Sequence, residues 1–203
     1  MKAESIVFAI AGMCFGVILG WVIGAQQAAS RVVTAPAGQS AAGGTANTRQ
    51  APVLDEAKVQ SLTTILKSDP KNATAAFQLA NVYFDAERFS DAIPWYERGL
   101  QAEPNNPDAS TDLGVSYYYT GQTDRALQQF ERSLKINPKH TKTMLNQGIV
   151  LAFGKQDLKG AAEAWKRVVE LAPDSPEGQA ARRGLEGIAS AGHPATPAPP
   201  PGG

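Results

Sequence analysis

Apolar residues recur along the middle of the chain every four positions, in units that repeat after 34 or 35 residues. Each unit ends at a proline that has an aliphatic residue four positions before it, and these prolines are Pro70, Pro104, Pro138 and Pro173. In the last three units an alanine lies twelve positions and an aromatic residue eight positions before the proline: Ala92 with Tyr96, Ala126 with Phe130, and Ala161 with Trp165. A spacing of four places side chains on one face of a helix, so the pattern predicts helices that pack through this stripe.

Small residues in the same register predict how the helices pair. Gly114 on a first helix and Ala126 on a second helix let two antiparallel helices cross closely, and the aromatic residue of the second helix is expected to fill the gap towards the next pair. The proline then ends the unit, because it has no N–H and disfavours helix at the residue before it. At Asn106-Pro107 a capping side chain precedes a proline, which predicts the start of a helix.

This pattern resembles the tetratricopeptide repeat (TPR) family, whose unit is a 34-residue helix–turn–helix. The resemblance covers three repeats, at residues 73–106, 107–140 and 141–175. It implies an all-α superhelix within residues 53–190, with a leading half repeat at 54–68 and a capping helix at 175–190. The third repeat departs from the family by one extra residue in "GKQDLKGA", which is not expected to change the fold.

The resemblance also implies a concave groove lined by the first helix of each repeat. The family's groove positions predict the following peptide-binding residues: Phe77, Asn81, Phe84, Thr111, Val115, Tyr118, Tyr119, Lys142, Asn146 and Ile149. The same register places Asp85, Asp108 and Asp112 along the groove. Aromatic side chains supply large contact area at low entropic cost, which suits a peptide or helix as ligand. Internal packing is the alternative role for Tyr118 and Tyr119, and it is the expected role of Phe153.

Relatives that bind chaperone C-termini use a basic carboxylate clamp at five of these positions. Asn81 and Lys142 match the clamp, whereas Phe77, Asp112 and Asn146 replace a lysine, an asparagine and an arginine. With Asp112 in the pocket and a single cation, a terminal carboxylate would be poorly neutralised. The sequence therefore predicts a groove that does not act as a chaperone clamp.

The N-terminal segment is predicted to be a transmembrane anchor, at residues 1–27. From Ser5 to Ala25 there are 21 residues without a charge, which as a helix span about the 30 Å of a bilayer core. A cleaved signal peptide, whose apolar region is about 7–15 residues long, is the alternative. Lys2 favours a cytoplasmic N-terminus, which puts the repeats on the other side of the membrane, in the periplasm if the protein is bacterial.

Glycines recur every four residues within this predicted anchor, at Gly12, Gly16, Gly20 and Gly24. Three overlapping GxxxG steps resemble a glycine zipper, which permits close helix–helix contact in lipid. The alternative is that glycine is simply common in transmembrane helices. A contact with another copy, giving a homo-oligomer, and a contact with a different protein are both open.

Two further segments are predicted to be disordered, because their composition cannot bury enough apolar surface. Residues 28–52 are rich in Ala, Gly, Ser and Pro and form a linker, and residues 191–203 form a proline-rich tail.

The balance of charges and the small number of cysteine and histidine residues limit the classes of function that the sequence supports. The 19 basic and 19 acidic residues balance, so nothing favours nucleic acid as a partner. Cys14 is the one cysteine, and the two histidines are His140, expected to be exposed in an inter-repeat turn, and His193. No nucleophile–base arrangement, metal motif or phosphate loop is present in the sequence, so we predict no enzyme activity and no cofactor.

The combined pattern predicts a membrane-anchored, non-catalytic interaction scaffold that binds a peptide or protein in its groove. Its architecture is similar to that of bacterial TPR subunits that assist cytochrome c maturation. The alternative is a structural protein that self-assembles through the glycine zipper.

Overall fold

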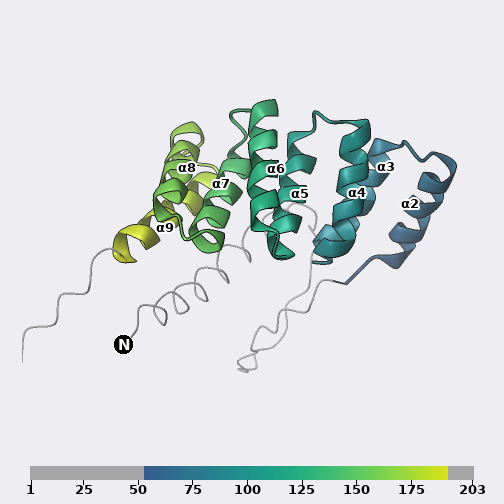
Figure 1. The fold of residues 1–203 in the computed structure, drawn as a ribbon, viewed down its shortest axis with the longest axis horizontal. Helices are drawn as coiled ribbons and strands as arrows, with labels where there is room; N and C mark the ends of the chain where they lie inside the picture. The colour runs from purple at the N-terminus through teal and green to yellow at the C-terminus, as the bar shows by residue number, and fades with distance from the viewer. Residues whose placement is uncertain (1–52, 192–203) are drawn as a thin grey trace, which may run out of the picture. The chain divides into compact units, whose positions relative to one another are not determined.

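The computed structural model describes residues 53–191, and within this range the chain forms eight α-helices and no strand (Figure 1). Their bounds are α2 Glu56–Ser68, α3 Ala73–Asp85, α4 Phe89–Ala102, α5 Pro107–Tyr119, α6 Thr123–Ile136, α7 Thr141–Ile149, α8 Leu158–Leu171 and α9 Pro176–Ala191. A π-helical turn, η1, extends α7 over Val150–Gly154. The predicted all-α repeat fold is confirmed for this part of the chain.

Several predictions fall outside the described residues. These are the anchor at 1–27 with its four glycines, the linker at 28–52 and the tail from residue 192. Within 53–191, every helix is too short or too polar to span a membrane.

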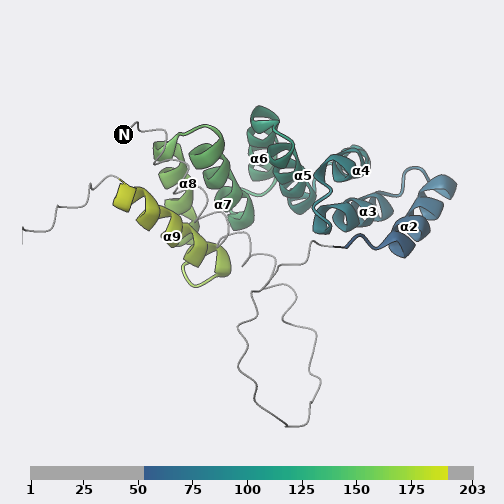
Figure 2. The same cartoon turned by 90° about the horizontal axis from the view of Figure 1, so that it is seen from below.

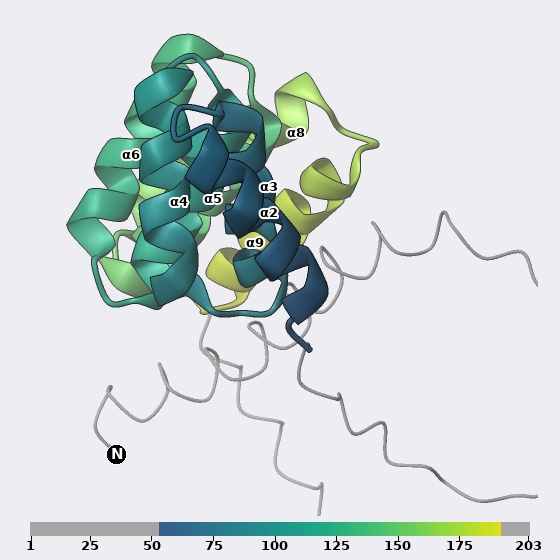
Figure 3. The same cartoon turned by 90° about the vertical axis from the view of Figure 1, so that its right-hand side faces the viewer.

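The helices follow one another in a row in chain order (Figure 1). Turned by 90°, the row shows two layers, with α4, α6 and α8 above α3, α5 and α7 (Figure 2). Figure 3 views the row from the end formed by α2 and shows the later helices stacked behind it. Each repeat therefore places its first helix in one layer and its second helix in the other.

Side-chain caps begin several of these helices where the sequence indicates. The Oδ1 atom of Asn106 accepts from the N–H of Ala109 at 2.9 Å, directly before Pro107 at the first helical position. Asn72 caps α3 in the same way, by accepting from the N–H of Ala75 at 2.9 Å. Such caps satisfy N–H groups that the first turn of a helix leaves unpaired.

Glycine on a first helix accommodates the aromatic residue of its own repeat. A Cβ atom added to Gly114 would lie 2.5 Å from the Cε1 atom of Phe130, which is 0% exposed. Trp165 fills the space over Gly148 of its own repeat and also that over Gly184 of α9. The sequence pattern predicts that these aromatic residues fill the gap towards the next helix pair. This holds in part for Trp165, which also meets Gly184 of α9, whereas Phe130 meets Gly114 within its own repeat.

The extra residue of the third repeat is absorbed as a wide turn at the end of α7. The N–H of Lys155 donates to the carbonyl of Val150, five residues earlier, at 3.1 Å. Gln156 then adopts a positive φ of 57° before α8 begins. A π-helical turn holds one residue more than an α-helical turn, so the insertion leaves the pairing of α7 with α8 intact.

Candidate functional site

The predicted groove residues lie on α3, α5 and α7, which form one layer (Figure 2). Asn81 is exposed and Thr111 is buried, and the remaining eight are partly buried: Phe77, Phe84, Val115, Tyr118, Tyr119, Lys142, Asn146 and Ile149. We call the surface formed by Asn81, Asp85, Asp112, Val115, Lys142 and Asn146 the inner face.

Most of the aromatic residues pack against one another at the edge of this surface. The rings of Phe89 and Tyr119 stack at 4.4 Å between centroids, and Phe84 meets the Phe89 ring edge-on at 5.3 Å. Tyr118 meets the Tyr119 ring edge-on at 5.7 Å and lies against Gly154. Internal packing, the alternative considered for Tyr118 and Tyr119, therefore accounts for a large part of their surface.

An ion pair joins α5 to α7 across the inner face. The Nζ atom of Lys142 lies 2.8 Å from the Oδ1 atom of Asp112. Burial raises the pKa of Asp112, and the adjacent Lys142 offsets this only in part. Burial would lower the pKa of Lys142, but Asp112, Asp108 and Glu177 together raise it. Because the ammonium group of Lys142 is already paired with the carboxylate of Asp112, it is poorly placed to neutralise a ligand's terminal carboxylate.

A further carboxylate, Asp85 at the end of α3, belongs to the same electrostatic environment. Burial raises the pKa of Asp85, although Lys58 and Lys142 act to lower it. The phenol of Tyr96 donates to Asn81 Oδ1 at 2.6 Å, and its pKa is raised by burial and by the charges of Asp112 and Asp85. Asp85, Asp112 and Lys142 thus interact electrostatically across α3, α5 and α7, which residue types at groove positions indicated but did not establish.

Thr111 lies inside the domain instead of on the inner face. Its Oγ1 atom is 2.6 Å from Thr143 Oγ1 and 3.1 Å from Ser133 Oγ, and all three side chains are fully buried. Thr111 and Ser133 both donate to the carbonyl of Pro107, at 2.7 and 2.9 Å. This hydroxyl cluster, Thr111, Ser133 and Thr143, connects α5, α6 and α7.

His140 differs from the expectation of an exposed turn residue, because its side chain is only 16% exposed. Its Nδ1 atom lies 2.6 Å from Thr143 Oγ1, and its Nε2 atom lies 3.2 Å from Asp108 Oδ1. An acid, a histidine and a hydroxyl in contact are the parts of a catalytic triad. Thr143 is 0% exposed, however, so no substrate can reach its hydroxyl, and the contacts hold the α6–α7 turn against α5.

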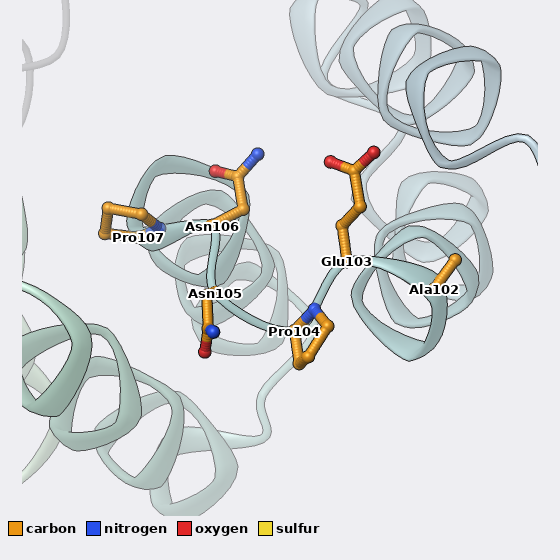
Figure 4. Close-up of a pocket in the computed structure, with 6 residues that line it drawn as sticks. All are labelled: Ala102, Glu103, Pro104, Asn105, Asn106 and Pro107. Atoms are coloured by element: carbon orange, nitrogen blue, oxygen red, sulfur yellow. The ribbon is translucent and has the colours of Figure 1, made fainter.

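A hollow of about 610 Å³ lies at the turn between α4 and α5 (Figure 4). It is lined by Ala102, Glu103, Pro104, Asn105, Asn106 and Pro107. The hollow is open to solvent, and Asn106 is engaged as the helix cap, so this turn offers little for a ligand. No group of three or more potential metal ligands occurs within residues 53–191.

Comparison with known proteins agrees with this geometry. The tetratricopeptide repeat family model matches residues 54–111 and 83–142. The first TPR of Spaghetti (RPAP3), solved with the HSP90 peptide SRMEEVD, is 28% identical with a TM-score of 0.54, over 61% of this chain and 94% of that chain. MamA from Desulfovibrio magneticus RS-1 is 25% identical with a TM-score of 0.54, over 58% of this chain and 67% of that chain. Another MamA structure shares the fold. It is 16% identical with a TM-score of 0.55, over 65% of this chain and 85% of that chain. Among curated proteins, no sequence matches the chain.

Paired helices stacked in chain order with a 34-residue period define an α-helical repeat protein. The family model and the similar structures support the tetratricopeptide repeat family for this chain. Repeats of this type present a surface for protein–protein interaction, and the inner face is the candidate for that surface.

Proposed function

We propose that the protein is a non-catalytic interaction scaffold that binds a peptide or protein segment along its inner face. The observation that carries this proposal is the similarity to the first TPR of Spaghetti, a peptide complex that is 28% identical and is covered over 94% of its length. Asn81, Val115 and Asn146 supply partly or fully exposed surface on three successive first helices, which suits an extended segment.

The scaffold acts at a membrane, anchored through residues 1–27, with the repeats on the side opposite the N-terminus. This part of the proposal rests on the uncharged stretch from Ser5 to Ala25. Assembly of envelope complexes, such as those of cytochrome c maturation, is the role that the anchor, linker and repeats together favour. A single-pass anchor would keep the inner face close to partners at the bilayer surface.

Self-assembly through the predicted glycine zipper is the second candidate function. It is favoured by one specific observation, the spacing of four between Gly12, Gly16, Gly20 and Gly24. In this case the repeats would be secondary, and the working contact would lie in lipid.

Affinity capture from crosslinked native membranes separates the two functions. We expect the full chain and a variant lacking residues 1–27 to retain the same partner, since binding is assigned to the repeats. Phe84→Ala combined with Tyr118→Ala should reduce capture several-fold, because both rings border the inner face. Leu158→Ala with Leu171→Ala, which removes two exposed apolar side chains from α8, is the matched control and should leave capture unchanged. If capture of a partner is lost when residues 1–27 are removed but is unchanged by the aromatic substitutions, the result would instead establish intramembrane assembly.

A further inference from the structure

We propose that the proline-rich segment after α9, residues 194–200, docks on an aromatic surface at one edge of the repeats of the same chain. This surface, which we call the aromatic edge, consists of Phe84, Phe89, Tyr118, Tyr119 and Phe153. The inference goes beyond the proposed function and does not depend on it, because it concerns a contact within one chain.

The aromatic edge repeats with the period of the fold. Phe84, Tyr118 and Phe153 are spaced 34 and 35 residues apart, and each is the penultimate residue of its element, α3, α5 or η1. The stacked rings of Phe89 and Tyr119 join the first two repeats into one surface, and Tyr118 lies against Gly154, the neighbour of Phe153. All five aromatic side chains are only partly buried, so their mutual packing leaves apolar surface for a ligand to cover.

The segment that follows α9 begins at the same edge. The turns from α3 to α4, α5 to α6 and α7 to α8 lie along the lower edge of the row, and α9 ends there as well (Figure 1). In addition, α3, α5, α7 and α9 contact one another in order. A segment that starts after Ala191 therefore starts beside the aromatic edge and has the ends of α7, α5 and α3 in sequence next to it.

The spacing of the prolines matches the spacing of the helices. Pro194, Pro197 and Pro200 are three residues apart. A polyproline II helix has three residues per turn and rises about 3.1 Å per residue, so these prolines would share one face, about 9, 19 and 28 Å from Ala191. Packed helices lie about 8–10 Å apart, so successive prolines would meet the ends of α7, α5 and α3 in turn.

The two surfaces are also chemically complementary. Residues 194–200 carry no charged side chain, which suits an apolar surface. Surfaces lined by aromatic side chains bind proline-rich segments in the polyproline II conformation, whose rigidity keeps the entropy cost of binding low. The carbonyl groups of this conformation have no internal partner and can accept from tyrosine hydroxyls. For the proposed function it follows that a partner that binds Phe84 and Tyr118 has to displace this segment.

Photocrosslinking within the full chain tests the inference. A photoreactive amino acid replaces Thr196, which lies between Pro194 and Pro197, and the purified full chain is irradiated in dilute detergent solution. We expect a crosslink within one chain, to peptides that contain Tyr118 or Phe153, identified by mass spectrometry.

Two proline variants separate docking from the mere proximity of a tethered segment. Pro197→Ala with Pro200→Ala should lower the crosslinking yield about three- to tenfold, the range for one lost contact with an aromatic ring. Pro199→Ala with Pro201→Ala is the matched control, because it removes as many prolines from the other faces, and it should leave the yield unchanged. All four positions lie after α9, so the packing of the repeats is the same in both variants.

Each outcome decides the inference. A crosslink at the aromatic edge that depends on Pro197 and Pro200, but not on Pro199 and Pro201, supports it. Equal yields in the two proline variants, crosslinks only between two chains, crosslinks elsewhere in the repeats, or no crosslink overturn it. None of these results measures partner capture, so the proposed function is tested separately.

Discussion

Phe130→Ala is expected to lower the free energy of unfolding by about 3–5 kcal/mol, the range for deleting a fully buried aromatic ring. Phe130 is 0% exposed and fills the space over Gly114 between the two helices of the second repeat. In a repeat array each unit is stabilised chiefly by its neighbours, so a cavity in the central repeat weakens both interfaces. Urea unfolding followed by far-UV circular dichroism measures the loss.

A control and a double variant test the mechanism. Leu158→Ala removes a side chain that is 47% exposed and should cost about 1 kcal/mol or less. Gly114→Ala alone should cost about 1–3 kcal/mol, because its new methyl group would meet the Phe130 ring. In the double variant the ring is absent, so the total loss should be smaller than the sum of the two. Strictly additive losses would contradict the contact between Gly114 and Phe130 as the reason for the glycine.

Thr143→Val is the second substitution with a large expected effect, a loss of about 1–3 kcal/mol in the free energy of unfolding. Valine has nearly the shape of threonine, so packing changes little and the lost hydrogen bonds dominate. Thr111, Ser133 and His140 all lie within 2.8 Å of the Thr143 hydroxyl, and two of these are fully buried. Their polar groups would lose a partner that water cannot replace.

The same substitution at an exposed position provides the comparison. Thr64 on α2 donates to the carbonyl of Gln60 at 2.9 Å and is exposed, so Thr64→Val should change the free energy of unfolding by about 0.5 kcal/mol or less. Equal effects at Thr64 and Thr143 would show that the hydroxyl cluster does not stabilise the junction of α5, α6 and α7.

The repeat register and the helix ends could be predicted from the sequence, because both depend on residues close together along the chain. Prolines, caps such as Asn106, and a spacing of four mark helices by local physics alone. The expected leading segment at 54–68 corresponds to α2, and the expected capping segment at 175–190 corresponds to α9.

The polar interior could not be predicted in the same way, because it depends on which side chains meet across different repeats. Thr111 holds a groove position in the repeat register, yet its hydroxyl contacts those of Ser133 and Thr143 in the interior of the domain. Likewise, Lys142 matched one position of a carboxylate clamp, whereas its pairing with Asp112 follows from the distance between α5 and α7. A repeat position therefore predicts neither whether a side chain reaches the surface, as Thr111 shows, nor whether its charge is already paired, as Lys142 shows.

Photocrosslinking from single positions tests the central claim, that the inner face binds a protein or peptide partner, most directly. A photoreactive amino acid replaces the exposed Asn81 on α3 in one full-length variant and the exposed Gln128 on α6 in another, and each is irradiated in native membranes. We predict a crosslinked partner from position 81 and none from position 128. A partner crosslinked from position 128 alone would contradict the account and place binding on the second-helix layer.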